Sequence, residues 1–291
     1  MERVTFTTPA GEAVFGLDSP YRLEKTEGFR DGEITSTVTQ YIDMDGGSVS
    51  GMLYEPRSLI VNGYLQAGSR KELAELRRKL SRLCGCKQEG VLKYICEGRE
   101  YVTAALPDSL PQWGDVLQNT QRFVCYFTAY GFYWESAKEN KEYILKTTNN
   151  LVFPFTFPGY FGYAVTRQNI TNEGDAPAPC VITIEGTAVG GISTFALTEG
   201  LEIINHTTGE HIFIAYDIAD TERIVIDTGI PSIISSVSGN ILHKLSFAED
   251  DTYTTEFFQL VPGQNDIECV NYNPANRITA NIRYRDRYAG V

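Results

Sequence analysis

Hydrophobic and polar residues alternate in short runs along most of this chain, and turn-forming residues separate the runs. Arg223-Ile224-Val225-Ile226-Asp227 and Glu100-Tyr101-Val102-Thr103-Ala104 show the period of two that is typical of half-buried strands. Glycine-containing breaks such as Asp45-Gly46-Gly47 and Thr208-Gly209 lie between runs of this kind. The pattern therefore predicts a mostly β protein.

One segment, residues 70–84, has a helical period instead. Four leucines recur there at steps of three and four and form one apolar stripe: Leu73, Leu76, Leu80 and Leu83. Ser69 and Glu72 form a capping box, in which each side chain satisfies a backbone N–H of the first turn, and Gly85 is a C-terminal stop. We expect the helix to pack on a sheet. Its basic face could bind an acidic partner, although solvated surface is the commoner role of lysine and arginine.

The chain is long enough for two domains, and its acidity is uneven. Its 291 residues carry a net charge of −12, of which −3 falls on residues 1–135 and −9 on residues 136–291. A boundary fits where the aromatic run 126–134 gives way to a charged stretch, although a charged hairpin inside one domain would look similar. We predict an N-terminal β domain, 1–135, with the helix 70–84, and a C-terminal β-sandwich, 136–291, because about ten short strands and no helix follow the boundary.

The acidic balance disfavours nucleic acid as a partner, because phosphate binding needs clustered Lys and Arg. We find no apolar run of signal-peptide or membrane-spanning length, so we expect cytoplasmic synthesis without a cleaved signal and no membrane insertion. In a reducing cytoplasm the six cysteines are most simply buried apolar thiols. The spacing of Cys84-Gly85-Cys86 does not fit a zinc knuckle, so we expect no metal site.

Catalytic motifs are also missing from the sequence. His206 and His211 are five apart, whereas a zinc-protease helix needs histidines at i and i+4, and Thr207-Thr208-Gly209 between them predicts a hairpin tip. Glu249-Asp250-Asp251 lacks the alternating spacing of a calcium loop and is better explained as an exposed acidic turn. There is no G-x-S-x-G elbow and no Walker loop. We therefore expect no enzyme and no cofactor.

Several local patterns occur in a fixed order over nearly the whole chain. Residues 59–63 form a strand that the capped helix soon follows, and residues 90–102 form a hairpin with an acidic-Gly-Arg turn. Three later patterns complete the set: the aromatic run ending Thr128-Ala129-Tyr130-Gly131-Phe132-Tyr133-Trp134, the run Ile224-Val225-Ile226-Asp227-Thr228, and the segment Leu260-Val261-Pro262-Gly263-Gln264-Asn265 before the closing residues 282–288. Together they resemble the distal tail protein family of siphovirus-type phages that infect Gram-positive bacteria.

The resemblance implies a structural role in the virion, at the phage tail tip. Members have an N-terminal β-rich domain that closes into a ring of six subunits and a C-terminal galectin-like β-sandwich that projects outward. The ring joins the tail tube protein to a tail-tip hub or tail-associated lysin, and in some members the outer domain anchors a receptor-binding protein. We place ring contacts in residues 1–135, with the aromatic run as candidate interface: Tyr126, Phe127, Tyr130, Phe132, Tyr133 and Trp134.

Two other functions remain open at this point. A galectin-like sandwich could act as a carbohydrate-binding module of a phage adsorption device. Trp113 and Trp134 both lie in the first half, which counts against a tryptophan platform in the sandwich, although Tyr160, Tyr163 or Tyr216 could take that place. A cell-wall hydrolase would need a carboxylate or metal site that the sequence does not reveal.

Overall fold

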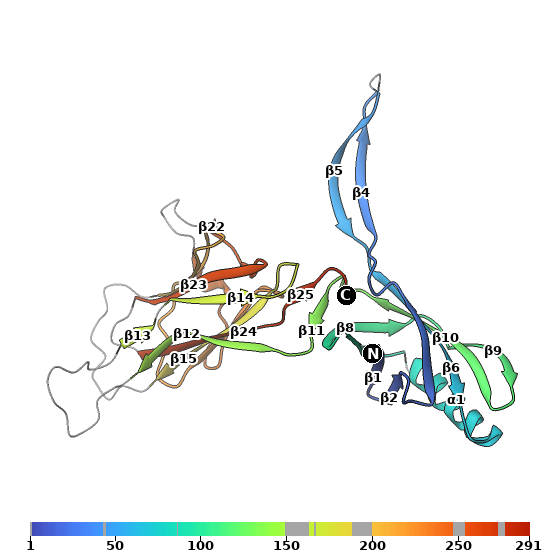
Figure 1. Ribbon diagram of the computed structural model, residues 1–291. Coiled ribbons are helices and arrows are strands. Elements are labelled where there is room, and N and C mark those ends of the chain that lie inside the picture. The colour runs from blue at the N-terminus through green and yellow to red at the C-terminus, as the bar shows by residue number, and fades with distance from the viewer. Residues whose placement is uncertain are drawn as a thin grey trace, which may run out of the picture. The chain divides into compact units, whose positions relative to one another are not determined.

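The computed structural model describes residues 2–42, 45–85, 87–148, 163–165, 167–187, 200–246, 254–272 and 277–291. In these residues the protein is mostly β with a single α-helix, which confirms the predicted class. The chain divides into two compact units (Figure 1). Unit 1 comprises Met1–Lys138 together with Tyr288–Val291, and unit 2 comprises Glu139–Arg287.

Unit 1 is built on a ten-stranded sheet in the order β25-β11-β8-β7-β1-β2-β3-β6-β10-β9. An additional pairing between β8 and β10 closes the seven strands from β8 to β10 into a circuit around the core. The strands are β1 (Arg3–Thr8), β2 (Gly11–Phe15), β3 (Tyr21–Glu27), β6 (Arg57–Gln66), β7 (Gly90–Cys96), β8 (Arg99–Pro107), β9 (Gln112–Leu117), β10 (Thr120–Ala129), β11 (Trp134–Ser136) and β25 (Arg287–Tyr288).

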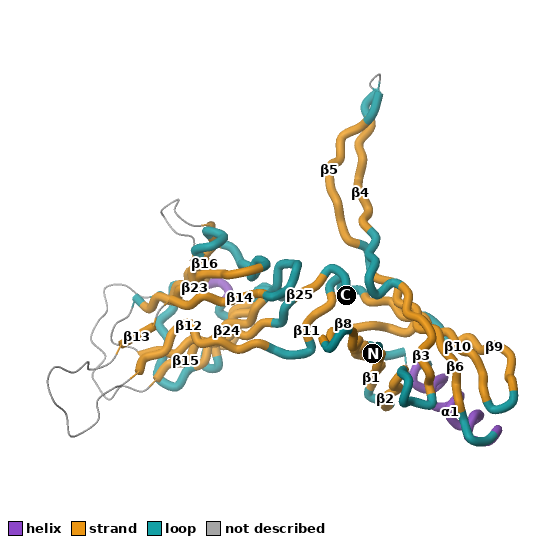
Figure 2. The backbone as a smooth tube through the Cα atoms, in the orientation of Figure 1, coloured by secondary structure: helices purple, strands orange, loops and turns teal. Residues whose placement is uncertain are grey.

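The helix α1 (Arg70–Cys84) spans the residues that the leucine period predicted and packs against β2, β6 and β10 (Figure 2). Leu73, Leu80 and Leu83 are buried beneath it. The Ser69 side chain accepts a hydrogen bond from the Glu72 N–H at 3.2 Å. The reciprocal half of the predicted capping box differs, because the Glu72 carboxylate accepts from the N–H of Gly68 rather than from that of Ser69.

The core of unit 1 is aromatic. Phe6 and Phe127 lie 4.7 Å apart between ring centroids, and Phe29 stacks on Trp134 at 5.4 Å. All four of these side chains are buried. Strand β10 supplies part of this core by the alternation that the sequence predicted, with every second residue buried from Gln121 onward.

The sequence predicted that the aromatic run 126–134 would form one strand, and this prediction was wrong. Strand β10 ends at Ala129, which pairs with Arg57 at the start of β6. The next four residues, 130–133, therefore have no ladder partner on that side, and the chain bends before β11 begins at Trp134. The bend separates the run into a part within the sheet and a part beside it.

Unit 2 is a sandwich of two sheets, as predicted. The seven-stranded sheet has the order β13-β12-β24-β15-β18-β19-β20, and the six-stranded sheet contains β14-β23-β16-β17-β21 with β22 paired to β17. The strands are β12 (Asn140–Thr148), β13 (Tyr163–Val165), β14 (Arg167–Asn172), β15 (Cys180–Thr187), β16 (Leu201–Asn205), β17 (Glu210–Ile214), β18 (Arg223–Asp227), β19 (Ser232–Ser235), β20 (Gly239–Asn240), β21 (Leu245–Ser246), β22 (Thr254–Thr255), β23 (Gly263–Asn271) and β24 (Arg277–Tyr284), with a 3-10 turn η1 at Leu242–Lys244.

The core of unit 2 consists mainly of isoleucine. Side chains such as Ile182 and Ile226 from one sheet and Ile203 and Ile212 from the other belong to a single buried cluster. β-Branched residues of this kind suit strands whose inner faces interdigitate. The two units thus have separate cores of different composition.

Local predictions about turns and thiols also hold. The hairpin of β7 and β8 turns through Glu97 and Gly98, both at positive φ (52° and 83°), as a type I′ turn requires. The segment between His206 and His211 is the tip of the hairpin of β16 and β17. Five cysteines are free and buried: Cys84, Cys96, Cys125, Cys180 and Cys269. Cys86 lies outside the described residues, as do Glu249-Asp250-Asp251.

Candidate interaction surface

Two strands of unit 1 pair only with each other and leave the body of the unit. They are β4 (Ile34–Gln40) and β5 (Gly47–Tyr54), and all fifteen of their residues are exposed. Figure 1 shows them extending beyond the ten-stranded sheet. We call this hairpin the arm. It contains no charged side chain in either strand, in a chain whose net charge is −12.

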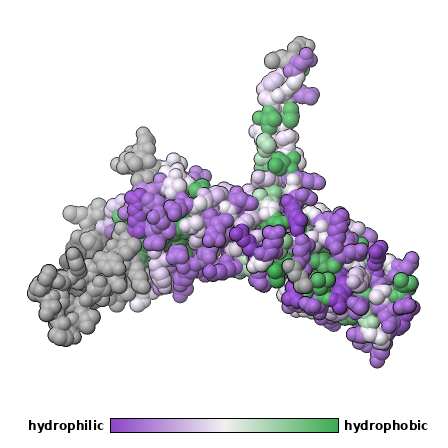
Figure 3. All heavy atoms as spheres, in the orientation of Figure 1, coloured by the Kyte–Doolittle hydropathy of each residue, from purple (hydrophilic) through white to green (hydrophobic). Residues whose placement is uncertain are grey.

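The register of the arm gives it two different faces. Ile34 pairs with Tyr54, and Val38 with Val49, so these side chains share one face. Met52 also lies on that face, opposite Ser36. The five apolar members are 48–64% exposed: Ile34, Val38, Val49, Met52 and Tyr54. The opposite face carries the hydroxyl groups of threonine and serine, a glycine and one exposed apolar side chain, Leu53, which pairs with Thr35. Figure 3 shows hydrophobic spheres along the arm.

Arg57 holds the base of the arm. Its guanidinium is buried, only 4% of the residue being exposed, and it donates hydrogen bonds to five backbone carbonyls. The acceptors are Gly28, Phe29, Asp31, Phe132 and Ala289. Burial lowers the pKa of Arg57 from its ordinary value, and the nearby Asp31 opposes that shift. Since β4 begins soon after Asp31 and β5 ends just before Arg57, one side chain joins both ends of the arm to the body of unit 1.

Aromatic rings complete the base. Tyr54, at the end of the arm, stacks on Phe132 with ring centroids 4.0 Å apart and an interplanar angle of 14°. Tyr133 meets both rings edge-on, and the Arg57 guanidinium lies over the Phe132 ring at 4.5 Å. Gly32 lies so close to Phe132 that an added Cβ would be 2.5 Å from the ring. We call Tyr54, Arg57, Phe132 and Tyr133 the base cluster.

The six aromatic residues proposed from the sequence therefore have different environments. Phe127 and Trp134 are fully buried, and the Trp134 Nε1–H donates to the carbonyl of Phe29 at 3.1 Å. Tyr126 is half-buried on the other face of β10. Phe132 and Tyr133 belong to the base cluster, whereas Tyr130 is 66% exposed. The sequence pattern did not predict the arm itself, whose one available signal was a pair of uncharged runs, 34–42 and 46–54, on either side of two aspartates.

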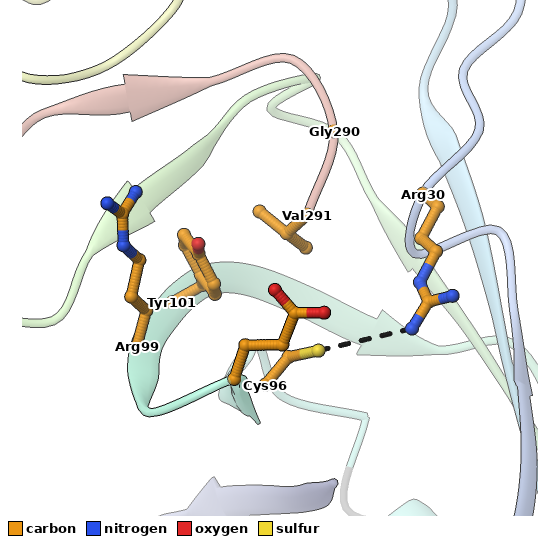
Figure 4. A pocket seen from close by; sticks show the side chains of 7 residues that line it. Arg30, Cys96, Arg99, Tyr101, Gly290 and Val291 are labelled. Atoms are coloured by element: carbon orange, nitrogen blue, oxygen red, sulfur yellow. Dashed lines mark hydrogen bonds between the residues drawn. The ribbon is translucent and has the colours of Figure 1, made fainter.

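A cavity of about 470 Å³ lies elsewhere in unit 1 (Figure 4). Arg99 and Tyr101 of β8 line it together with Arg30 and Cys96. The Arg30 guanidinium is already engaged, 2.7 Å from the carboxylate of Glu2. The carboxylate of Glu97, which also lines the cavity, offsets the charge of the second guanidinium, that of Arg99. We therefore assign no ligand to the cavity.

In unit 2 a hydroxyl, an imidazole and a carboxylate lie in line. His211 is buried, its Nδ1 is 2.6 Å from the Glu202 carboxylate, and its Nε2 is 2.8 Å from the Thr255 hydroxyl. A hydrolytic triad would need a backbone N–H free to bind an oxyanion. The N–H of Glu256, next to Thr255, instead donates to the His211 carbonyl. The arrangement attaches β22 to β17, so we assign it a structural role.

Within the described ranges, no group of three or more His, Cys, Asp or Glu side chains is placed to hold a metal ion. Over the same part of the chain, no helix is long and apolar enough to cross a membrane. Of the tyrosines considered for sugar binding, Tyr216 is half-buried and donates its hydroxyl to the Glu222 carboxylate. Tyr160 and the side chain of Tyr163 lie outside the described part.

Solved structures share the fold of the whole chain. The crystal structure of the SPP1 Dit (gp 19.1) protein, described as a paradigm of the hub adsorption apparatus in phages infecting Gram-positive bacteria, matches with a TM-score of 0.60 and 13% identity over 92% of this chain and 93% of that chain. Chains of the phage P2 baseplate in its activated conformation, with Ca or with Sr, match at TM-scores of 0.51 with 13% and 12% identity. The alignment with the Ca form covers 100% of both chains.

A comparison with curated proteins gave no match. The family model described as the siphovirus-type tail component, C-terminal domain, matches residues 173–288. These residues make up most of the sandwich of unit 2. Over residues 173–288 the chain is therefore similar to the C-terminal domain of the siphovirus-type tail component family.

Proposed function

We propose that this chain is a structural subunit of a phage tail tip, a distal tail protein that forms a ring between the tail tube and the host-adsorption apparatus. The family match of unit 2 and the fold shared with the SPP1 Dit protein support the tail location. The arm is the observation that carries the assembly role. The proposed role requires no catalysis and places the protein in the virion.

An isolated two-stranded hairpin is marginally stable at best in water, and its free edges can pair with other chains. The arm combines such edges with an apolar face whose side chains are about half exposed. The absence of charged residues from its two strands lets them approach a second acidic copy with little repulsion, although both copies carry a net charge of −12. A neighbouring copy is therefore the partner that best fits this face.

A contact between the arm of one copy and a different surface of the next is heterologous, and contacts of this kind close into rings when the rotation permits. We assign ring formation to the N-terminal domain, residues 1–135, which contains the arm and its base. We propose a homohexamer that contacts the tail tube protein on one side and a tail-tip hub or tail-associated lysin on the other. The sandwich, residues 136–291, is then available to hold a receptor-binding protein.

Light scattering of the purified chain, followed by negative-stain microscopy, tests the proposal. We expect hexamers with a central hole. A Val38→Asp/Met52→Asp variant, which places charge on the apolar face, should be monomeric. The matched variant Thr35→Asp/Thr39→Asp on the hydroxyl face should still assemble. Rings in the first variant would show that the arm is not the contact, and a monomeric wild type at its highest soluble concentration would contradict self-assembly.

One observation favours carbohydrate binding by unit 2 as a second function. Tyr272 is 40% exposed, lies edge-on to Phe213 at 5.9 Å and donates its hydroxyl to the Glu202 carboxylate. An exposed aromatic ring offers a face on which a sugar can stack, and the buried Glu202 carboxylate fixes the position of this ring. A glycan array with the wild type and a Tyr272→Ala variant separates the two functions, because a ring subunit without a sugar site gives no signal in either case.

A further inference from the structure

Helix α1 carries an unusual concentration of positive charge for so acidic a chain. Six of its fifteen residues are cationic and exposed: Arg70, Lys71, Arg77, Arg78, Lys79 and Arg82. Its two acids, Glu72 and Glu75, leave the helix a net charge of +4, so the remaining residues carry −16. Glu72 is also occupied, because its carboxylate accepts from the N–H of Gly68.

In the part of the chain that the structure describes, no cation of α1 takes part in an ion pair. Among the described residues, pairs within 4 Å involve Lys25, Arg30, Lys93, Arg122, Arg167, Arg223 and Arg283 and two histidines. None of these belongs to α1. The helix therefore presents these charges to solvent.

The helix geometry arranges three of the cations in a line. Lys71, Arg78 and Arg82 are spaced by seven and four residues, which places them within an arc of about 40° at 100° per residue. The arc is opposite the apolar stripe, whose leucines face the sheet. The line is about 16 Å long at 1.5 Å per residue. We call these three residues the basic stripe. Glu75, at about 40° on the same side of the helix, lies between Lys71 and Arg78 along the axis, so the row as a whole has a net charge of +2. Arg70 and Arg77 lie about 100° and 120° from the middle of the basic stripe, on one side of the apolar stripe.

We propose that the basic stripe of α1 docks an acidic protein surface, whose carboxylates pair with Lys71, Arg78 and Arg82. Guanidinium groups bind carboxylates in a bidentate manner. A row of three cationic side chains on a rigid helix therefore selects a partner of negative charge and also fixes the orientation in which that partner binds. A carboxylate-bearing protein fits better than nucleic acid. The stripe would neutralise only about three phosphates, while the −16 on the rest of the chain repels a long polyanion. This contact is separate from the arm and adds a second binding surface to the proposed ring subunit.

The test uses the full chain and poly-L-glutamate immobilised on a biosensor as the carboxylate probe, in a series of salt concentrations. We expect measurable binding that weakens as salt rises. A Lys71→Glu/Arg78→Glu/Arg82→Glu variant should bind roughly tenfold more weakly or not at all. The matched variant Arg70→Glu/Arg77→Glu/Lys87→Glu makes the same change in net charge and should lose less than about threefold.

Circular dichroism and tryptophan fluorescence must show that both variants keep unit 1 folded, and a neutralising Lys71→Gln/Arg78→Gln/Arg82→Gln variant serves if the charge reversal does not fold. If the two charge-reversal variants lost binding affinity for poly-L-glutamate equally, the proposal would be wrong, because net charge alone would then explain the binding. Absence of binding by the wild type at low salt would overturn it as well. If duplex DNA displaced the protein from the sensor at lower concentration than soluble poly-L-glutamate, the assigned class of partner would be wrong.

Discussion

Replacing Arg57 with methionine tests whether one buried guanidinium fixes the arm to unit 1. The substitution keeps most of the side-chain volume but removes every donor. Five carbonyl groups then lose the hydrogen bonds that Arg57 donates, and the ring of Phe132 loses its cation at 4.5 Å. An unsatisfied buried acceptor costs about 1–3 kcal/mol, but water can reach some of these carbonyls once the base loosens. We therefore expect a loss of roughly 4 kcal/mol in the free energy of unfolding of unit 1.

Tryptophan fluorescence makes this measurement specific to unit 1. The chain has two tryptophans, Trp113 and Trp134, and both pack in or against the core of that unit. With a urea dependence of about 2 kcal/mol per M, the midpoint of the fluorescence transition should fall by about 2 M. Arg57→Lys should recover only part of the lost stability, because a single ammonium group cannot reach all the carbonyls that the three nitrogen atoms of the planar guanidinium contact.

Arg122→Met is the matched control for Arg57→Met. Its side chain is 76% exposed and makes one ion pair with Glu24 at 3.4 Å, so the loss should be below about 1 kcal/mol. A loss below about 1 kcal/mol for Arg57→Met as well would refute the reasoning. It would mean that the carbonyls around Arg57 find water as readily as protein and that the base cluster is held by its rings alone.

Three further substitutions or treatments probe other parts of the structure. Gly28→Ala should destabilise unit 1 by about 2 kcal/mol or more in the same urea titration, because φ is +78° there and the new Cβ would lie 1.9 Å from a carbonyl oxygen of β6. The Arg167 guanidinium holds the pKa of Asp266 below its usual range. The pair therefore stabilises unit 2 at pH values above the pKa of Asp266 in the unfolded chain, and this stabilisation is lost as the pH falls through the lower pKa of the folded protein. Arg167→Gln should therefore lower the melting temperature of unit 2 at neutral pH and flatten its pH dependence below about pH 4; an unchanged profile would contradict the pairing. Burial raises the pKa of Cys180 and Cys269 to about 12, so iodoacetamide at about pH 8 should label them only as unit 2 unfolds, and labelling at the rate of a free thiol would contradict their burial.

Features that depend on neighbours in sequence could be predicted from the sequence alone. The leucine period and the cap of α1 place both ends of the helix, because helical hydrogen bonds join residues four apart. The Glu97-Gly98 turn follows equally from local backbone preference. The strands of the sandwich are recognisable because isoleucine at alternating positions suits a face that packs on another sheet.

Burial of the aromatic residues could not be predicted in the same way. Phe127 and Phe132 are five residues apart in one run of rings, yet the first is fully buried and the second lies at the base of the arm. The difference arises because β6 supplies a ladder partner for β10 only as far as Ala129. That limit is set by residues some seventy positions earlier in the chain, so no local pattern contains it.

The arm shows a second limit, which concerns what the hydrophobic pattern reports. Alternation in β4 resembles that in β8, but Tyr101 and Ala105 of β8 are buried within unit 1, whereas Ile34 and Val38 of β4 are about half exposed. The pattern thus predicts a face that excludes water without saying which molecule covers it. Covering the five side chains on the apolar face of the arm would contribute about 5 kcal/mol per contact, which only just reaches the lower estimates of the cost of association. Ring closure offsets part of that cost, since the last subunit makes two contacts but loses its translational and rotational freedom only once. Assembly through the arm should therefore be cooperative in protein concentration, with monomers and closed rings present and open chains scarce.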